Sequence, residues 1–353
     1  MNMIKKRFAS FLLLVCLLCS TFNYGFAESP DTYIEPSLSE YNTESPALYS
    51  AKSVSNLVLY TERDKNSERI LFRKGKTKID LLYVGVNWCI GRYKDKIGYI
   101  KRERIESPSP INPGTPPYGI FPSTWTAKIK SDCAVHKTMS LGSESFCTLN
   151  QGTPIAVWKI INNWAIVIYM RQYGYIPVQN LENFTPVANK VLNIKKNYIL
   201  SAYSSFYKTD DTESNRGRMH NIQYAAEKLR MIIYPGQTFD YNKMIGPFSL
   251  ANGYQKATVL YEGEAVQGSG GGVCQVSSTL YNALLPLNGI TIIKRRAHGP
   301  SGASYLPHGV DAASGSKSLN LIFRNDYDFP IEIYGYSCGD GTLFISISSY
   351  NAP

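Results

Sequence analysis

An internal repeat is the feature that most narrows the folds open to this chain of 353 residues. Each copy contains a glycine, a tryptophan, a Gly-Tyr-Ile triplet and a closing aliphatic residue, at Gly75, Trp88, Gly98–Ile100 and Ile105, and again at Gly152, Trp164, Gly174–Ile176 and Leu181. By subtraction, glycine and tryptophan are 13 and 12 residues apart, and tryptophan and the next glycine are 10 apart in both copies. Short strands separated by turn dipeptides are typical of small barrels, so the repeat predicts two all-β domains.

The expected strands of the two copies correspond in order. They are Leu57–Tyr60, Ile79–Val84, Trp88–Tyr93 and Gly98–Lys101 in the first, and Cys133–His136, Pro154–Ile161, Trp164–Ile168 and Gly174–Pro177 in the second. The pattern resembles bacterial SH3-like domains over 53–106 and 126–185, and the resemblance implies modules that hold wall glycan or peptide. A second interpretation stays open, in which Trp88, Trp164, Tyr99 and Tyr175 only fill the barrel cores.

Three other segments have compositions of their own. Residues 1–27 combine a basic start, an apolar stretch and a small-residue cleavage site at Gly25-Phe26-Ala27, which predicts a signal peptide. An uncleaved anchor is the alternative, and it would be the chain's one contact with a membrane. Residues 28–52 lack periodicity and predict a flexible linker, and residues 107–125 predict a Pro-rich linker.

A glycine-rich run leads into a candidate helix in the second half of the chain. Residues 268–272 contain four glycines, and Cys274 follows at the expected start of a helix that buries Val276, Leu280, Ala283 and Leu284. The free N–H groups and the macrodipole of a helix N-terminus stabilise a thiolate. Cys274 is therefore a candidate nucleophile, although a buried core cysteine is the plainer interpretation.

Two further polar residues follow the candidate helix. His298 lies after a β-branched run at 289–293, and Asp311 follows in a Gly-Pro-rich stretch. A cysteine with a histidine base and a third residue to orient it is a recurrent arrangement of thiol enzymes. A metal site at His298, His308 and Asp311 is an alternative that their spacing does not support.

The remaining elements predict an α+β domain over 190–350. We expect a strand at 187–200, a helix at 221–230, and an antiparallel meander of three strands near 319–323, 331–334 and 343–347. The predicted fold class is therefore multidomain, with two small all-β SH3-like barrels followed by an α+β domain.

The C-terminal part of the chain resembles the VanW-like family over about 214–348. The resemblance is carried by Arg218–Ile222, Tyr234–Phe239, Gly270–Ala283, His298 and Tyr305 with Pro307, Gly309 and Asp311. Asp240-Tyr241 and Gly299 depart from the usual family pattern. The resemblance implies an envelope location and a link to peptidoglycan, and it says little of mechanism.

Charge and cysteine content agree with an exported protein. The net charge of +10 falls to +7 without the three basic residues of the leader, and it is spread along the chain. This predicts weak affinity for anionic wall polymer or a membrane surface, and no nucleic-acid partner. No metal or other cofactor is expected. Five cysteines remain after the leader, too few for a disulfide scaffold, and a pairing of Cys133 with Cys147 stays open.

Two classes of function follow from these residues. In the first, an exported envelope protein acts on wall peptide as a thiol acyltransferase or hydrolase through Cys274, His298 and Asp311, with N–H groups near Gln275 as oxyanion donors. In the second, the domain binds or scaffolds without chemistry, and its glycine loop clasps a glycan or a partner. The candidate binding residues are Gln275, Gly270, Gly271, Gly272, Ser277, Tyr305 and Arg218.

Overall fold

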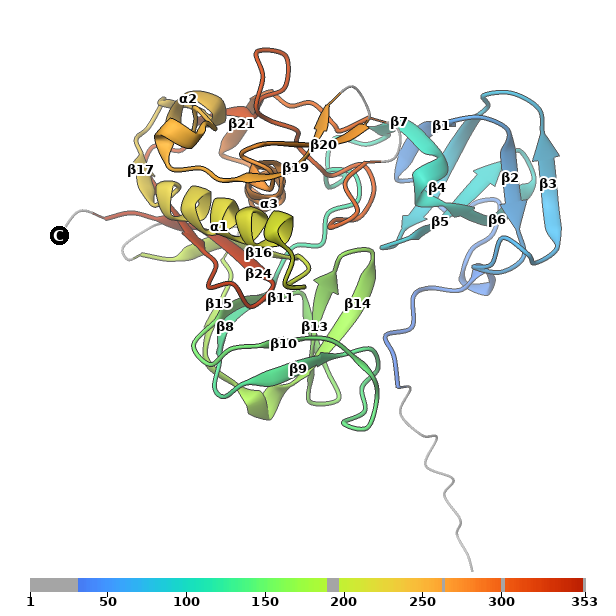
Figure 1. Cartoon of the computed structure of the whole chain (residues 1–353). Helices are drawn as coiled ribbons and strands as arrows, with labels where there is room; N and C mark the ends of the chain where they lie inside the picture. The colour runs from blue at the N-terminus through green and yellow to red at the C-terminus, as the bar shows by residue number, and fades with distance from the viewer. Residues whose placement is uncertain (1–30, 189–196, 262–263, 300–301, 352–353) are drawn as a thin grey trace, which may run out of the picture. The chain divides into compact units, whose positions relative to one another are not determined.

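The computed structural model describes residues 31–188, 197–261, 264–299 and 302–351 (Figure 1). The predicted signal peptide lies outside these residues. So does most of the strand predicted at 187–200, of which only the last two residues are observed in a strand. Within the described residues, each helix is too short or too polar to cross a bilayer.

The first repeat folds as one antiparallel sheet of seven strands. Its order is β3-β2-β6-β5-β4-β1-β7. The strands are β1 (Tyr49–Ser53), β2 (Leu57–Tyr60), β3 (Arg69–Arg73), β4 (Lys78–Val84), β5 (Trp88–Tyr93), β6 (Lys96–Lys101) and β7 (Ile105–Pro110), with the short helix η2 (Arg102–Arg104) before β7. All four strands expected in this copy are confirmed.

The second repeat forms two sheets, ordered β10-β9-β14-β13-β12 and β11-β8-β15. The strands are β8 (Trp125–Ile129), β9 (Cys133–His136), β10 (Ser145–Leu149), β11 (Pro154–Val157), β12 (Lys159–Ile161), β13 (Trp164–Tyr169), β14 (Gln172–Pro177) and β15 (Leu181–Pro186), with η3 (Val178–Asn180) before β15. The strand expected at 154–161 is interrupted at Trp158, which divides it into β11 and β12. The prediction treated this segment as continuous.

The two repeats share one strand order. Reading the lists side by side, β3, β2, β6 and β5 correspond to β10, β9, β14 and β13, and β4 corresponds to the divided pair β12 and β11. The sequence repeat is therefore a repeat of topology. Among the described residues, each sheet has two edge strands that do not pair with each other. A closed barrel of the predicted kind is therefore not found.

The glycine of each Gly-Tyr-Ile triplet has the same packing role. A Cβ on Gly98 would lie 2.8 Å from Cβ of Leu59, and one on Gly174 would lie 2.6 Å from Cγ1 of Val135. Those two side chains come from β2 and β9, which are equivalent strands. A larger residue at either position would separate strands that cross closely in the core.

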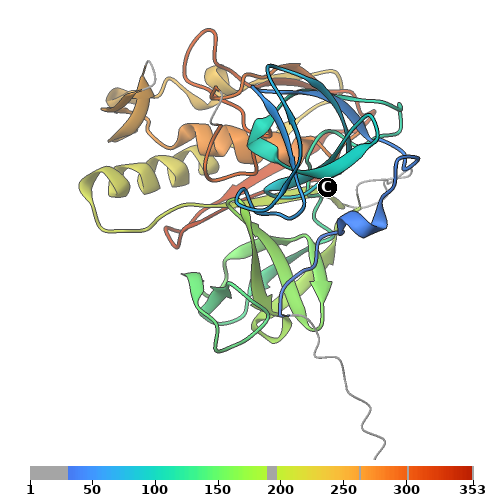
Figure 2. The same ribbon diagram turned by 90° about the vertical axis from the view of Figure 1, so that its right-hand side faces the viewer.

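Residues 31–52, which precede the first repeat, are structured, in contrast to the flexible linker predicted for 28–52. The last four of these residues belong to strand β1, and η1 (Leu38–Glu40) lies before them (Figure 2). The backbone N–H of Tyr33 donates to the Tyr175 hydroxyl at 2.7 Å, and that of Leu38 donates to the Tyr99 hydroxyl at 3.1 Å. The same tyrosine of both triplets thus holds one N-terminal segment.

The linker predicted at 107–125 also begins and ends within strands. Its first residues belong to β7, and Trp125 opens β8. Between them Phe121 is buried, and the Tyr118 ring lies 5.5 Å from that of Tyr49. Proline-rich composition here marks an ordered connection that packs on the first repeat, not a free spacer.

The C-terminal region combines four-, three- and two-stranded sheets with two longer helices. Their orders are β16-β24-β23-β17, β18-β22-β21 and β19-β20. The strands are β16 (Ile199–Phe206), β17 (Met231–Ile233), β18 (Thr238–Asp240), β19 (Lys256–Tyr261), β20 (Glu264–Ser269), β21 (Ile290–Lys294), β22 (Ile322–Asn325), β23 (Ile331–Tyr336) and β24 (Thr342–Ser349). The helices are α1 (Glu213–Lys228), α2 (Tyr241–Ile245), η4 (Leu250–Asn252) and α3 (Val273–Leu284).

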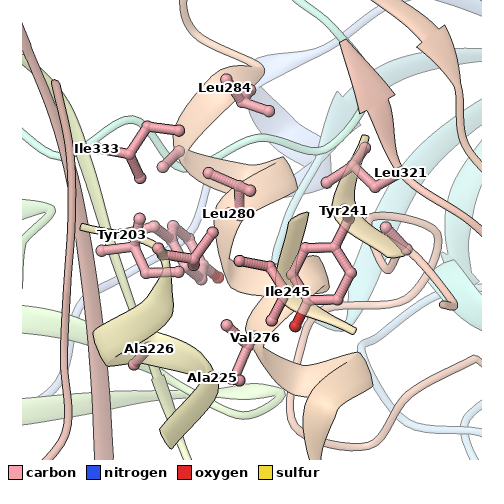
Figure 3. Close-up of a cluster of buried hydrophobic side chains, with 14 of the residues drawn as sticks. Tyr203, Ala225, Ala226, Tyr241, Ile245, Val276, Leu280, Leu284, Leu321 and Ile333 are labelled. Carbon is pink, nitrogen blue, oxygen red and sulfur yellow. The ribbon is translucent and has the colours of Figure 1, made fainter. Parts of the chain in front are cut away.

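Helix α3 lies beside α1 at the centre of this region (Figure 1). Its predicted apolar face is confirmed, because Val276, Leu280, Ala283 and Leu284 are all buried. Figure 3 shows this face directed toward Ala225 and Ala226 of α1 and toward Tyr203, Tyr241 and Ile245. The α+β architecture predicted for this region is therefore observed, and α3 is held rigidly on its apolar side.

Two local predictions for this region are corrected. Helix α1 begins at Glu213, eight residues before the expected start, because the Thr212 hydroxyl caps it by accepting from the N–H of Asn215. The expected three-strand meander is only a pair. Strand β22 pairs with β18 and β21 in a separate sheet, while β23 and β24 pair with each other.

Candidate active site

Cys274 is the second residue of helix α3. The glycine before the helix, Gly272, adopts φ 107°, a left-handed conformation that favours glycine. A Cβ there would lie 3.0 Å from the backbone oxygen of Arg218 on α1. The tight turn therefore requires glycine, and it starts the helix one residue before the thiol, where the helix dipole favours negative charge. The Cys274 side chain is half-buried.

The sulfur of Cys274 is surrounded by hydrogen-bonding groups of Ser314. The Ser314 backbone N–H lies 3.4 Å from Sγ and its hydroxyl 3.6 Å, and both can donate to the sulfur. The Ser314 backbone oxygen lies 3.4 Å away and accepts from the thiol when it is protonated. The same residue can thus bind both protonation states of the thiol, through its donors and its acceptor respectively.

His298 and Asp311 form the second half of the site. The Nδ1 of His298 lies 2.6 Å from Oδ2 of Asp311, and the His298 backbone N–H donates to the same oxygen at 2.7 Å. The two side chains are 14% and 2% exposed, respectively. Because Asp311 holds Nδ1–H, Nε2 is the ring nitrogen left for the thiol.

The pKa shifts of Cys274 and His298 each favour the charged form of the group, a thiolate and an imidazolium. Burial raises the pKa of the Cys274 thiol, but the hydrogen bond and positive charge of His298, with the donors of Ser314, lower it below its ordinary value of 9.0. Burial lowers the pKa of His298, but the hydrogen bonds to Asp311 and Cys274 and their charges raise it to about 9. A thiolate–imidazolium pair is therefore favoured over the neutral thiol–imidazole pair.

Asp311 is held in the ionised form by its surroundings. Burial raises the pKa of its carboxyl, but hydrogen bonds from the His298 ring and backbone, together with the charges of His298 and Arg295, lower it below 3.8. Arg295 lies 3.5 Å from Oδ1 of Asp311 and donates to the Asp311 backbone oxygen at 2.6 Å. A buried carboxylate with these partners orients the imidazole and balances its charge.

Three polar side chains of α3 fasten the chain that carries Asp311 and Ser314. Ser278 Oγ accepts from the Ala312 N–H at 2.9 Å, and Asn282 Nδ2 donates to the Val310 oxygen at 2.7 Å. Ser277 Oγ donates to the Ala312 oxygen at 2.6 Å. All three side chains are buried. The helix that carries the thiol and the segment that carries its partners are therefore one hydrogen-bonded unit.

The other candidate binding residues lie around this unit. Gln275 is fully buried and donates to Ser205 Oγ at 2.9 Å while its Oε1 accepts from Arg218 at 2.6 Å. The Tyr305 ring lies edge-on to His298, with centroids 6.5 Å apart, and the Arg218 guanidinium lies 5.8 Å from its centre. These residues therefore surround the candidate site.

The glycines before the helix are packed rather than open. A Cβ on Gly270 would lie 2.7 Å from Cβ of Phe248, and one on Gly271 would lie 2.6 Å from the backbone oxygen of Thr258. With Gly272 they are all buried. The backbone of the loop therefore contacts α1, β19 and Phe248, which explains the run of glycines by close packing.

The oxyanion donors expected near Gln275 are only partly available. The Gln275 N–H donates to the Gly272 oxygen at 2.9 Å, so it is already used. The Cys274 N–H has no acceptor among the described residues. It is one free donor of the N-terminal turn beside the sulfur.

His308 makes no described contact with Cys274, His298 or Asp311. Its backbone oxygen instead accepts from Arg102 of the first repeat at 2.7 Å. No cluster of three or more His, Cys, Asp or Glu that could hold a metal occurs in the described residues. All five cysteines that the structure describes, Cys133 and Cys147 included, are free thiols.

Sequence reasoning did not single out Ser314, Arg295, Ser278 or Asn282. Their roles depend on contacts across 16 to 40 residues of chain, such as Ser314 with Cys274. Polar residues at Ser278 and Asn282 inside an otherwise apolar helix were the one available signal, since buried polar side chains need partners.

The fold and these contacts define an α+β domain with a cysteine–histidine–aspartate arrangement at a helix N-terminus. Residues 217–348 match the family model described as VanW like protein, so the C-terminal region of this chain is similar to that family. The departures at Asp240-Tyr241 and Gly299 leave that match intact.

Two curated relatives share this region. Over 144 residues the chain is 36% identical to "Uncharacterized protein YoaR" of Bacillus subtilis (strain 168), which covers 40% of this chain and 46% of that protein. Over 122 residues it is 30% identical to "Vancomycin B-type resistance protein VanW" of Enterococcus faecalis (strain ATCC 700802 / V583), which covers 33% and 44%. The matches span less than half the length of either relative.

Among solved structures, NlpC1 from Trichomonas vaginalis aligns over 91% of this chain and 98% of its own, with 11% identity and a TM-score of 0.16. A likeness this weak defines no shared fold.

Proposed function

We propose that this protein is an exported cell-envelope protein that acts on wall peptide as a thiol acyltransferase or hydrolase. The observation that carries the proposal is the set Cys274, His298 and Asp311, in which the imidazole is hydrogen-bonded to a buried carboxylate and, against the effect of burial, lowers the pKa of the thiol. A nucleophile, a base and a group that orients the base are the three parts that covalent acyl transfer requires.

The reaction divides into two balanced steps. The Cys274 thiolate attacks the carbonyl carbon of a peptide bond, a C–S bond forms, and the C–N bond breaks as His298 gives its proton to the leaving amine. The resulting thioester is then attacked by water or by a second amine. His298 takes the proton of that nucleophile, the C–S bond breaks, and the thiolate returns.

The Cys274 N–H would donate to the oxyanion of each tetrahedral intermediate. Its place beside the sulfur at a helix N-terminus supports this role, because fixed N–H donors stabilise developing negative charge. The two repeats, whose strand orders agree, would act as SH3-like modules that associate with peptidoglycan. The resistance protein named above is consistent with an envelope role for the VanW-like domain.

The alternative is a binding or scaffold protein whose glycine loop clasps a glycan. The packing of Gly270 and Gly271 against Phe248 and Thr258 argues against it, because a loop in such contacts leaves little backbone for a ligand. A lowered thiol pKa also has no purpose in a scaffold.

The test is a comparison of the full exported chain with its Cys274→Ser variant on purified peptidoglycan, with the peptide products measured by mass spectrometry. Serine keeps the size of the side chain, so the variant should fold and lose all turnover. Ser318→Ala, an exposed serine near the site segment, is the matched control and should keep full turnover. Unchanged products from Cys274→Ser would reject the thiol mechanism in favour of the scaffold.

A further inference from the structure

A hollow of about 550 Å³ lies in the C-terminal region. Gly315 forms part of its wall, and the preceding residue, Ser314, contacts the sulfur of Cys274. Because consecutive Cα atoms are about 3.8 Å apart, the wall of the hollow is one residue from a group that contacts the candidate nucleophile. Its volume is in the range of about 300–1,000 Å³ that is usual for ligand sites.

Three lysines line the hollow, namely Lys243, Lys294 and Lys317. Lys294 Nζ donates to the Lys317 backbone oxygen at 2.9 Å. No carboxylate lies in ion-pair range of any of the three among the residues that the structure describes. Three ammonium groups gathered around one hollow without internal counter-charge raise the local concentration of anions.

Asp240 is the one acidic residue of the lining. Its Oδ1 already accepts from the Lys243 N–H at 3.0 Å and from Asn320 Nδ2 at 2.8 Å. Asp240 therefore serves as a helix cap. Its negative charge offsets one of the three positive charges, so a net charge of +2 remains (three minus one).

The wall of the hollow is held in place before any ligand arrives. Asn242 Oδ1 accepts from the Gly315 N–H at 2.9 Å, and its Nδ2 donates to the Ser316 and Leu319 oxygens, each at 2.8 Å. Phe248 adds an aromatic surface. A fixed loop lowers the entropy that a ligand must lose on binding.

We propose that this hollow binds the acidic part of the peptide substrate, a segment with at least two free carboxylates, and so presents a neighbouring carbonyl to Cys274. The inference rests on the proposed function and names its substrate class. The paired ammonium groups would form ion pairs with carboxylates, and the Phe248 ring would pack against the aliphatic part of a peptide. No arginine among the described residues lines this hollow, so it lacks the planar fork that binds phosphate through two hydrogen bonds.

The test measures binding to the full-length Cys274→Ser variant, so that no chemistry is needed. The probe is a fluorescent Glu-Glu-Glu peptide, and Gln-Gln-Gln is its uncharged match. We expect saturable binding of the first that weakens with salt, and much weaker binding of the second. Lys243→Met and Lys317→Met should each weaken binding about threefold, and the double variant about tenfold.

Lys256→Met is the matched control, since Lys256 is an exposed lysine of the same domain on β19. It should leave the affinity unchanged. Three outcomes would overturn the inference. They are equal affinity for the two peptides, equal weakening of binding by Lys256→Met, and displacement of Glu-Glu-Glu by inorganic phosphate at the same concentration of charge. If the peptide binds but the wild-type protein shows no turnover, the binding site is supported and the thiol mechanism is rejected. If the wild-type protein shows turnover that does not depend on the lysines, the thiol mechanism is supported and the binding site is rejected.

Discussion

The guanidinium of Arg102 donates from Nε to the backbone oxygen of His308 at 2.7 Å, which joins the first repeat to the loop between His298 and Asp311. The same fully buried side chain donates to the oxygens of Gly85 and Gly119, each at 3.0 Å. It has no carboxylate partner among the described residues, so three backbone oxygens from three segments satisfy its charge. The repeat is thus built into the frame of the site.

Replacing Arg102 with methionine should therefore disturb both stability and the thiol. Three buried carbonyl oxygens would lose their donor, which should lower the free energy of unfolding by about 3 kcal/mol. The loop of His308 would be released, and alkylation of Cys274 should slow. Urea unfolding and iodoacetamide kinetics measure the two effects. Arg104→Met, an exposed arginine two residues away, should change neither. A stable Arg102→Met variant with a normal alkylation rate would show that the repeat does not support the site.

Asp311→Asn should raise the pKa of the thiol at almost constant shape. The amide oxygen can still accept from His298 Nδ1, but the negative charge that stabilises the imidazolium is lost, so the pKa of His298 falls. Less imidazolium then faces the sulfur. We expect iodoacetamide to alkylate Cys274 several-fold more slowly at pH 6 and at a nearly normal rate at pH 9.5. Asp328→Asn, which removes an exposed charge of the same domain, should follow the wild-type pH profile. Identical profiles for both variants would exclude coupling through Asp311.

The pKa of His298 also predicts how stability depends on pH. Its value is about 9 in the folded protein against 6.5 as the ordinary value, so the folded state binds the proton more tightly. The contribution is complete below pH 6.5 and is lost as the pH rises through about 9. The difference corresponds to at most about 3 kcal/mol. Urea unfolding at pH 6.5 and pH 9.5 should show this loss in the wild type and a much smaller loss in His298→Gln. A loss of equal size in both proteins would assign it to other groups.

The two triplet tyrosines give a local prediction. Tyr175→Phe removes the acceptor of the Tyr33 N–H, and Tyr99→Phe removes that of the Leu38 N–H. Each variant should speed hydrogen exchange at its own amide by several-fold and leave the other amide nearly unchanged, because a lost hydrogen bond costs about 1 kcal/mol. Tyr93→Phe, with no such bond to the segment, is the control. Unchanged exchange in both variants would mean that other contacts hold the segment, such as those of Glu35.

Glu35 makes three such contacts. Its carboxylate accepts from the Tyr173 hydroxyl at 2.5 Å and the Val86 N–H at 3.1 Å, and it lies 3.0 Å from Arg63. These partners come from both repeats, so a segment predicted to be flexible from its composition joins them. Composition reports what a segment can do alone, whereas this segment is ordered by partners that are distant in sequence.

The sequence by itself determined the parts whose cause is local. The apolar spacing of Val276, Leu280 and Leu284 defined α3, and the glycines before it placed Cys274 at its N-terminus. Matched spacings defined the two repeats and most of their strands. Periodicity and turn residues act over a few neighbours, so they can be read from the chain directly.

Only the tertiary structure decided which polar groups meet. Ser314 and Cys274 are 40 residues apart, Arg102 and His308 are 206 apart, and β22 pairs with β18 and β21 rather than with its neighbour β23. Such contacts form because buried polar groups must find partners wherever the fold brings them, and one chain contains many that could serve. The thiol of Cys274 therefore had a predictable position, while its pKa was set by residues that folding brought to it.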